Sequence, residues 1–325
     1  MILYFFLAGL ISYFLTYFTR KIAIKKAMID LPNERSSHTV PTPRGGGIAI
    51  ALTWFISITL MYYFHQIEGS LYLALISGLL LSIISLVDDI YTLKNKPRLL
   101  VQAIVAGLGL YFVGGFNEVD LGFVVFTNAY VLNILAFITI VWFINLFNFI
   151  DGIDGYASSE SIFVIASLYF FTGESFLLFL LMALVGFLPW NWDKAKIFMG
   201  DVGSTLLGYT IVILLFYYHH TLQLTIFEGL ILTSLFWFDA TYTLIRRFIN
   251  KENVGQAHRK HAFQRIVQSG FSHQKTVLYG MSVNLILFFM ILYTRFLHVV
   301  DFVVLLISIL LLFLLMFFVN KKKAF

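Results

Sequence analysis

The chain has 325 residues, of which 60% are apolar and 12% charged, with a net charge of +5 and no cysteine. In a soluble domain roughly a quarter of the residues are charged, so the composition excludes a sizeable soluble domain. The lack of cysteine excludes disulfides, thiolate metal sites and thiol nucleophiles. Because membrane topology accounts for the positive charge, we expect no nucleic-acid partner.

Apolar stretches of near membrane-spanning length follow one another along the chain. They lie near residues 1–19, 47–66, 70–87, 99–115, 128–148, 157–172, 175–190, 204–218, 225–245, 277–294 and 300–319. We therefore predict an all-α, polytopic integral membrane protein with about eleven transmembrane helices, formed as a single domain over residues 1–325. The first stretch lacks a basic leader and a small-residue cleavage motif, so we expect it to be retained as a span.

Basic residues set the expected orientation. Of the 22 Lys and Arg residues, 21 fall in alternate gaps between the stretches or at the end of the chain, and Arg295 is the exception. Since Lys and Arg collect on the cytoplasmic side of a membrane, the N-terminus is expected in the periplasm and the C-terminus in the cytoplasm. An odd number of spans agrees with ends on opposite sides.

Two adjacent carboxylates, Asp88 and Asp89, close the third stretch. One Asp there would be ordinary loop charge, whereas ionisable pairs at a membrane boundary are typical of functional sites. Adjacent carboxylates repel each other and attract hard cations. The pair can therefore hold Mg²⁺, or one member can accept a proton while the other assists.

A row of polar side chains follows the fifth stretch. At intervals of three residues it contains Asn145, Asn148, Asp151 and Asp154. On a helix this spacing predicts one shared face, while Gly152 and Gly155 permit a break or a close approach to a ligand. A polar helix terminus with glycine stops explains one Asp-Gly pair, but not four polar residues in register.

Asp201 lies between two glycines, on a turn that leads into the eighth stretch. A carboxylate there can coordinate a metal while backbone N–H groups of the next helix face an anion. The same segment carries Asn191 and Phe198. Ser204, just after it, is also explained as a helix N-cap.

Asp239 lies inside the ninth stretch, about two helical turns before a pair of arginines. Snorkelling or pairing with a nearby cation explains it as well as function does. The following loop carries His258 and His261 with Arg259 between them, an arrangement that suits a pyrophosphate better than a metal. A positive-inside loop alone would supply Arg259 but would not require paired histidines.

The first loop, residues 33–47, is basic and ends in Arg44 and three glycines. It is not a P-loop, because no Gly-Lys-Ser/Thr follows. The glycines suit tight packing where the second stretch starts, and a basic, glycine-rich segment also suits phosphate binding.

Taken together and in this order, the motifs resemble those of the polyprenyl-phosphate N-acetylhexosamine-1-phosphate transferases, the group that contains WecA and MraY. The resemblance spans residues 33–265. It rests on the Asp-Asp pair, the Asn-x-x-Asp-Gly-x-Asp-Gly run that begins at Asn148, and the Phe-Met-Gly-Asp-x-Gly-Ser segment that begins at Phe198.

This resemblance implies transfer of an N-acetylhexosamine phosphate from a UDP-sugar to undecaprenyl phosphate, with release of UMP and initiation of a lipid-linked envelope glycan. It implies a need for Mg²⁺, for which Mn²⁺ can substitute. The implied place is the bacterial inner membrane, with the active site facing the cytoplasm. A homodimer is left open.

The resemblance also implies roles for individual residues. Asp88 resembles the base that deprotonates the lipid phosphate, with Asp89 beside it, and Asp201 resembles the metal ligand. The implied lining of the nucleotide and pyrophosphate site is Asn148, Asp151, Asp154 and Asn191, with Phe198 as the aromatic that stacks on uracil. Arg98 and Gln102 resemble the family's basic-x-x-x-Gln pair.

His258 and His261 fall at the family's histidine motif, here in the form His-Arg-x-His-x-x-Gln-Arg. The triple His of the MraY branch and the His-Ile-His-His of the WecA type are both absent from the sequence. The form is similar to the O-antigen-initiating branch, which implies a GlcNAc-like donor or a deoxy-amino sugar. A phospho-MurNAc-pentapeptide transferase is the nearer alternative, although eleven spans resemble the WecA side more than the ten-span MraY type.

Charge sets the expected mechanism, because attack of one phosphate on another brings several negative charges together. Mg²⁺ on Asp201, with Asp88 as a further candidate ligand, would offset them. Help is expected from Arg44, Arg98, Arg259 and the two histidines. A secondary transporter is the alternative from another class, and it is disfavoured because the acidic residues gather at one membrane face and no inverted repeat is evident.

Overall fold

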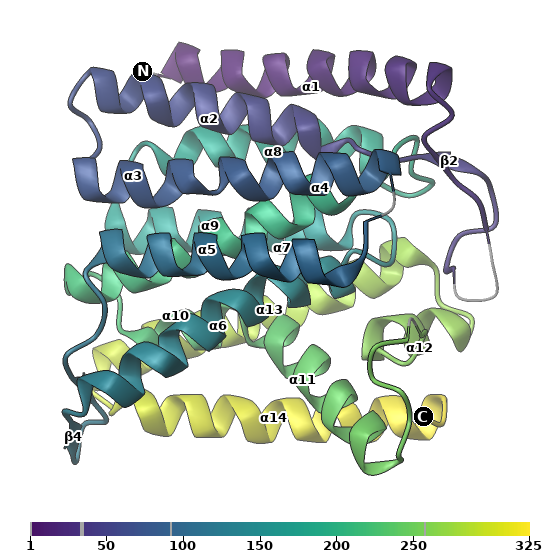
Figure 1. Ribbon diagram of the computed structural model, residues 1–325. Helices are drawn as coiled ribbons and strands as arrows, with labels where there is room; N and C mark the ends of the chain where they lie inside the picture. The colour runs from purple at the N-terminus through teal and green to yellow at the C-terminus, as the bar shows by residue number, and fades with distance from the viewer. Residues whose placement is uncertain (1, 33–35, 92, 257) are drawn as a thin grey trace.

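The computed structural model describes residues 2–32, 36–91, 93–256 and 258–325, and it forms a bundle of helices (Figure 1). Part of the first-loop motif, residues 33–35, lies outside the described residues. Two short antiparallel hairpins complete the described structure, β1 (Ile29–Asp30) with β2 (Thr42–Pro43), and β3 (Val119–Asp120) with β4 (Val125–Phe126).

The helices follow the apolar stretches closely. They are α1 (Ile2–Lys25), α2 (Gly47–Tyr63), α3 (Gly69–Ser77), α4 (Leu79–Tyr91), α5 (Asn95–Val113), α6 (Ala129–Ile150), α7 (Tyr156–Thr172), α8 (Leu177–Asn191), α9 (Asp201–His220), α10 (Ile226–Leu232), α11 (Ser234–Ile249), α12 (Ala262–Gln268), α13 (His273–Phe296) and α14 (Asp301–Lys322). Among the described residues, seven helical segments are long and apolar enough to cross a membrane, with α3 and α4 together counted as one. The chain is therefore an all-helical, multi-pass membrane protein. The count of eleven crossings and the orientation of the termini stay predictions.

Helix α9 lies in the middle of the bundle, and 16 of its 20 residues are buried. It packs against α6, α4 and α2, while α1 and α14 lie at opposite edges of the bundle (Figure 1). Apolar residues cover all sides of this helix, a pattern that predicts burial on all sides. The first residue of this buried helix is Asp201, so the fold places that carboxylate where several other helices end.

The glycine run of the first loop packs directly against the segment that precedes α9. The N–H groups of Gly46 and Gly47 donate to the carbonyl oxygens of Phe198 and Met199, at 2.9 and 2.8 Å. A Cβ atom on Gly47 would lie 2.3 Å from the backbone nitrogen of Gly203. Two backbones therefore touch here, which is the tight packing that the glycines suggested.

We expect Gly47→Ala to lower the free energy of unfolding by about 2–3 kcal/mol, because the added methyl group meets backbone atoms that cannot rotate away. Thermal unfolding of the detergent-purified protein measures this. The matched control is Gly107→Ala in α5, where an added Cβ meets no atom within 4 Å and helix propensity favours alanine. Equal stability of the two variants would show that α2 and α9 can move apart to admit the methyl group without a loss in the free energy of unfolding.

Arg295, the one basic residue expected on the far side, has a specific partner there. Its guanidinium donates to both oxygens of the buried Glu228, with 2.7 Å between Nη2 and Oε2, and its charge lies 4.4 Å from the ring of Phe171. Such a bidentate pair ties α13 to α10. Local pairing therefore explains why this arginine departs from the charge pattern.

Candidate functional site

The site is built around the N-terminus of α9. Gly200, just before Asp201, has φ of +74°, a conformation that favours glycine. A Cβ atom there would approach the Gly45 nitrogen at 3.1 Å and Asp89 Oδ2 at 3.3 Å. A short parallel bridge between Arg44 and Phe198 joins the two segments. The glycine run and the Asp201 turn thus form one structural unit.

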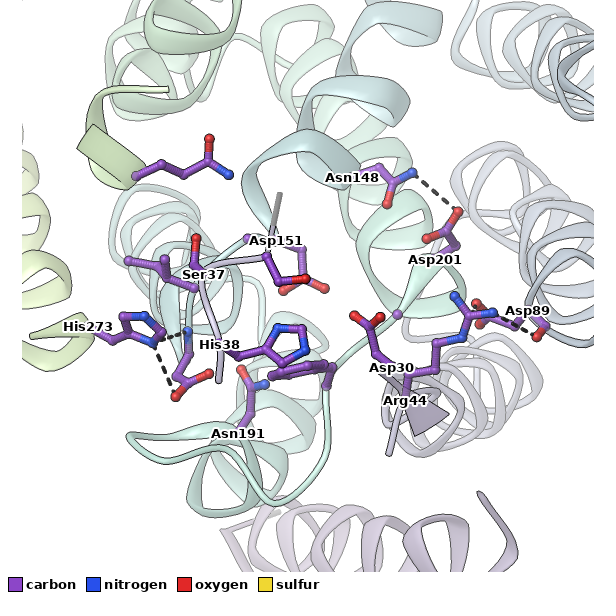
Figure 2. Close-up of a pocket in the computed structure, with 17 residues that line it drawn as sticks. Asp30, Ser37, His38, Arg44, Asp89, Asn148, Asp151, Asn191, Asp201 and His273 are labelled. Atoms are coloured by element: carbon purple, nitrogen blue, oxygen red, sulfur yellow. Dashed lines mark hydrogen bonds and ion pairs between the residues drawn. The ribbon is translucent and has the colours of Figure 1, made fainter. Parts of the chain in front are cut away.

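A cavity of about 400 Å³ opens beside this unit, and we refer to it as the first cavity (Figure 2). Its walls come from the first loop, the ends of α4, α6 and α8, and the starts of α9 and α13. The lining residues are Asp30, Ser36, Ser37, His38, Arg44, Asp89, Asn148, Asp151, Gly152, Ile153, Asp154, Asn191, Phe198, Gly200, Asp201, Gln264 and His273. Eight of the fourteen predicted site residues therefore meet here.

Arg98 joins two of the predicted carboxylates. Its Nη1 lies 2.7 Å from Asp88 Oδ2, and its Nη2 lies 2.8 Å from Asp201 Oδ2. Asn148 also donates to Asp201 Oδ2, at 3.3 Å, and accepts a hydrogen bond from Ser204 Oγ, at 3.2 Å. Ser204 is therefore not the N-cap of α9, a position that Gly200 occupies. A planar guanidinium suits this bridging role, because it presents two parallel pairs of donors.

The adjacent aspartates Asp88 and Asp89 differ in their surroundings. Asp88 accepts from the Leu93 N–H at 2.6 Å as well as from Arg98, and it does not line the first cavity. Asp89 lines it, and Arg44 Nε lies 3.6 Å from its Oδ1. The other oxygen of Asp89 is buried, and it has no hydrogen-bond partner among the described residues. Of the pair, Asp89 is the one with an oxygen available to a ligand.

The polar row does not continue along one helix, contrary to the prediction. Helix α6 ends at Ile150, and Asp151 caps it with φ of −71° and ψ of 54°. Gly155 has φ of +72° and starts α7, so the glycines produce the break that their freedom permits. As a result Asn148 and Asp151 both reach the first cavity, whereas Asn145 hydrogen-bonds to Gln102 and lines only the second cavity described below.

Carboxylates crowd the first cavity. Burial, together with the negative charges of Asp201, Asp154 and Asp89, raises the pKa of Asp151 to about 7, although a hydrogen bond from Gly200 N–H opposes this rise. An anionic form that is so disfavoured gains from a nearby cation. The electrostatics of this wall therefore favour binding of a positive ion.

Two predicted lining residues have mainly structural partners. The Asn191 side chain accepts from Gly155 N–H and Ser158 Oγ, at 3.2 and 2.8 Å, and donates to the Ile197 carbonyl at 3.2 Å. Asp154 Oδ2 accepts from the Ala195 N–H at 3.2 Å. Both therefore hold the loop that leads to Phe198, and they line the cavity from that position.

A second cavity, of about 410 Å³, lies on the other side of Asn148. Its lining residues are Asn95, Arg98, Leu99, Gln102, Asn145, Asn148, Phe149, Ala240, Leu244, Val254, Gly255, Gln256, His258 and His261. Gln102 and Asn145 hydrogen-bond to each other there, at 2.8 Å from Asn145 Nδ2 to Gln102 Oε1. This cavity combines apolar side chains of α5, α6 and α11 with the predicted Arg98, Gln102 and histidine pair.

Of the predicted residues in the loop after α11, the two histidines line the second cavity and Arg259 lines neither cavity. The rings of His258 and His261 lie 4.9 Å apart. Burial, followed by the neighbouring charges of His261 and Arg247, lowers the pKa of His258 to about 4, so this imidazole is neutral at pH 7. Arg259 instead donates to the Ser36 carbonyl at 2.9 Å and lines neither cavity. Its guanidinium joins this loop to the first loop.

The residues present fit a divalent cation. Mg²⁺ prefers oxygen ligands, and it often takes only one or two carboxylates beside substrate phosphates. Among the described residues, no group of three or more Asp, Glu or His side chains is arranged so that it could hold a metal ion by itself. The carboxylates of Asp89, Asp151 and Asp201 nevertheless face one cavity, with an unpartnered oxygen on Asp89. This donor set suits a partly substrate-held Mg²⁺.

Sequence reasoning missed six polar residues of the first cavity, Asp30, Ser36, Ser37, His38, Gln264 and His273. His38 packs edge-on against Phe198, with ring centroids 4.8 Å apart, and His273 Nδ1 lies 3.2 Å from Asp154 Oδ2 (Figure 2). His38 lies in the first loop, residues 33–47, whose basic and glycine-rich composition was the signal available. His273 begins an apolar span, and nothing in its neighbours marked it.

Comparisons with known proteins agree with this geometry. The model of glycosyl transferase family 4 matches residues 71–219. A Bacillus subtilis protein described as a probable undecaprenyl-phosphate N-acetylglucosaminyl 1-phosphate transferase is 31% identical over 280 residues, which cover 81% of this chain and 76% of that protein. Undecaprenyl-phosphate alpha-N-acetylglucosaminyl 1-phosphate transferases are also similar. The one from Thermotoga maritima is 30% identical over a region that covers 92% of this chain and 94% of that protein. The one from Escherichia coli K12 is 30% identical over a region that covers 83% of this chain and 77% of that protein.

These relatives share most of their length with this chain. A multi-pass helical fold, a carboxylate-rich cavity at the start of α9 and a neighbouring cavity with apolar walls are consistent with one reaction class. The chain therefore belongs to the polyprenyl-phosphate N-acetylhexosamine-1-phosphate transferases of glycosyl transferase family 4, which are membrane-bound phosphotransferases.

Proposed function

We propose that this protein transfers N-acetylglucosamine 1-phosphate from UDP-N-acetylglucosamine to undecaprenyl phosphate and releases UMP. The observation that carries the proposal is the meeting of two different cavities at Asn148. Arg98 lines the second cavity, Asp201 lines the first, and their ion pair stands between them at 2.8 Å. A reaction between two phosphates needs such a boundary, with a substrate site on each side.

The first cavity is proposed to take the sugar nucleotide. Phe198 offers an aromatic surface to the uracil, and Arg44 offers a guanidinium to the diphosphate. Asp89, Asp151 and Asp201 would hold Mg²⁺, which would supply charge neutralisation to the diphosphate when bound. Asp88, also predicted as a ligand, is engaged by Arg98 and Leu93 N–H, so we propose that it holds Arg98 in place.

The second cavity is proposed to take the phosphate of the lipid acceptor. Leu99, Phe149 and Leu244 give it apolar walls suited to an isoprenoid chain, while Arg98 and Gln102 supply donors for the phosphate. His258 is neutral at pH 7 and so acts there as a hydrogen-bonding group rather than as a cation. His261 completes the wall. A secondary transporter would not need two dissimilar cavities.

The chemistry is a single phosphoryl transfer. An oxygen of the lipid phosphate forms a bond to the sugar-bearing phosphorus of UDP-N-acetylglucosamine, and the bond from that phosphorus to the bridging oxygen breaks. UMP leaves with that oxygen and its electron pair. Asp89, which lines the first cavity beside Asp201, is the candidate to accept a proton from a protonated lipid phosphate when that phosphate reaches the boundary between the cavities. Arg98 stabilises the negative charge that gathers between the cavities.

We further propose that the site faces the cytoplasm at a bacterial inner membrane. The C-terminal ends of α1 and α14, which carry basic residues, lie at the same end of the bundle as α12 and the site (Figure 1). Lys and Arg at one end predict the cytoplasmic side. Sugar nucleotides made in the cytoplasm would reach the first cavity from there, and the lipid product would start an envelope glycan.

The experiment that tests the proposal is transfer of radiolabel from UDP-N-acetylglucosamine to undecaprenyl phosphate by the purified protein, with Mg²⁺ or with a chelator. We expect a lipid-linked product only when Mg²⁺ is present. Product with UDP-N-acetylgalactosamine or a deoxy-amino sugar alone would change the donor. No product with any UDP-sugar, from folded protein, would overturn the proposal.

A further inference from the structure

Asp239 is a buried carboxylate that the proposed reaction leaves without a role. It lies in α11, its exposed fraction is 5%, and it lines neither the first nor the second cavity. A buried carboxylate is costly unless specific donors satisfy it. Its partners therefore indicate what it does.

Most of those partners belong to the segment that carries the histidines, and one, Thr243, lies on α11 itself. Both oxygens of Asp239 accept from the N–H of Ala262, at 2.9 Å each, and Oδ1 also accepts from Thr243 Oγ1 at 3.1 Å. His261 Nδ1 lies 3.8 Å from the same Oδ1, beyond hydrogen-bond distance, and it is buried with no hydrogen-bond partner among the described residues. Ala262 is the first residue of α12, so the carboxylate caps this helix.

His261 is held from several sides at the junction of the two elements. Its exposed fraction is 4%, and its backbone N–H donates to Gln264 Oε1 at 3.4 Å. Its ring lies parallel to that of Phe263, with an angle of 9° between the planes. One ring nitrogen faces Asp239, while the residue also lines the second cavity.

The nearby cations have other partners. Arg247 pairs with Glu252, with 3.1 Å between Nε and Oε2, and Arg265 donates to Asn320 Oδ1 at 2.6 Å. Pairing of Asp239 with a neighbouring Arg, one of the explanations for its place in the sequence, is therefore not what these contacts show. The carboxylate instead faces a backbone N–H, a hydroxyl and an imidazole.

We propose that Asp239 is a positioning residue for His261. It holds the first N–H of α12 and faces one nitrogen of the His261 ring, so that the ring keeps its place at the wall of the second cavity. Carboxylates commonly orient functional imidazoles in this way. The inference rests on the proposed function, because the second cavity is where that function places the lipid phosphate.

The test is a double-mutant cycle in the transfer assay with Asp239→Asn, His261→Ala and both changes together. We expect Asp239→Asn to lower kcat by about 10- to 100-fold, since a small misplacement of a functional group costs up to about 10²-fold. In the His261→Ala background the same change should cost less than about 3-fold, because coupled residues are non-additive. Full, independent losses would overturn the proposal.

The matched control is Thr243→Val, which removes one hydrogen bond to the same carboxylate but leaves its contacts with Ala262 and His261. We expect this variant to retain kcat within about 2-fold. A loss equal to that of Asp239→Asn would mean that general disruption of α11 is responsible, which would also overturn the proposal. If Asp239→Asn does not fold, Asp239→Ser, which is shorter and uncharged, replaces it in the cycle.

Amide hydrogen exchange provides a readout that does not depend on the reaction. We expect exchange across residues 261–265 to be at least about 10-fold faster in Asp239→Ala, which removes both acceptor oxygens, than in the unmodified protein or Thr243→Val, because a helix end without its cap opens more often. Unchanged exchange would overturn the positioning role. Transfer activity that is absent with every UDP-sugar while exchange responds would refute the proposed function and leave the capping contact established.

Discussion

Asp201→Asn is expected to lower the rate of transfer by about 10³-fold or more. Without the charge stabilisation that the bound metal supplies, the free energy of the transition state rises by several kcal/mol. Asp201 is the first residue of the central helix, and its Oδ2 already receives Arg98 at 2.8 Å and Asn148 at 3.3 Å. An amide keeps the shape of the side chain but not its charge. Initial rates over a range of Mg²⁺ concentrations measure the effect.

Thermal unfolding separates loss of the metal from loss of the fold. We expect Mg²⁺ to raise the Tm of the unmodified protein and to leave that of Asp201→Asn unchanged, since a ligand stabilises only a state that binds it. The control is Asp193→Asn, a carboxylate in the neighbouring loop that does not line the first cavity, and it should keep the Mg²⁺ response. A near-normal rate for Asp201→Asn would remove this residue from the proposed metal site.

Arg98→Ala is the second change with a large expected effect, a fall in kcat of about 10²- to 10³-fold, which is typical when one donor to a developing oxyanion is removed. The change also leaves Asp88 and Asp201 without the cation that separates them. We expect a loss of about 2 kcal/mol in the free energy of unfolding, below the cost of breaking a fully buried pair, because the Arg98 side chain is 24% exposed. The transfer assay and thermal unfolding measure the two effects.

Two controls show which property of Arg98 matters. Arg98→Lys keeps the charge but not the planar fork, so it should retain more activity than Arg98→Ala while losing part of the bridge between the two carboxylates. Lys96→Ala removes an exposed cation two residues away. It should change the transfer rate by no more than about 2-fold and the free energy of unfolding by no more than about 0.5 kcal/mol. An Arg98→Ala rate within about 3-fold of the unmodified protein would show that the ion pair at the cavity boundary has no part in the reaction.

The sequence could predict much of the fold because membrane insertion depends on composition. Stretches such as residues 128–148 and 204–218 are apolar in the sequence and helical in the structure, since a backbone in lipid must satisfy its own hydrogen bonds. The break after α6 was predicted only as one option. Helix α6 stops at Ile150, and Gly152 and Gly155 allow the turn that follows, but the polar spacing also fitted one shared helix face.

The composition of the site was also predictable in part. Asp89, Asn148, Asp151 and Asp201 stand out in a chain with so few charges, and all four line the first cavity. The contacts of His38 and His273 could not be predicted in this way, although His38 lies in a loop that the sequence already singled out. Their importance depends on neighbours more than 100 residues away, Phe198 and Asp154, and no local pattern encodes such a contact.

Which candidate residues line the first cavity and which line the second depends on tertiary packing. Asn145 and Asn148 are one helical turn apart, yet Asn145 lies only in the second cavity and Asn148 borders both. Asp88 and Asp89 are adjacent, yet one holds Arg98 and the other faces the first cavity. Composition and motif order were enough to predict a helical membrane protein whose acidic and basic motifs gather at one membrane face. The division into two cavities came from the structure, because the direction of a side chain depends on where its helix ends and which helices pack beside it.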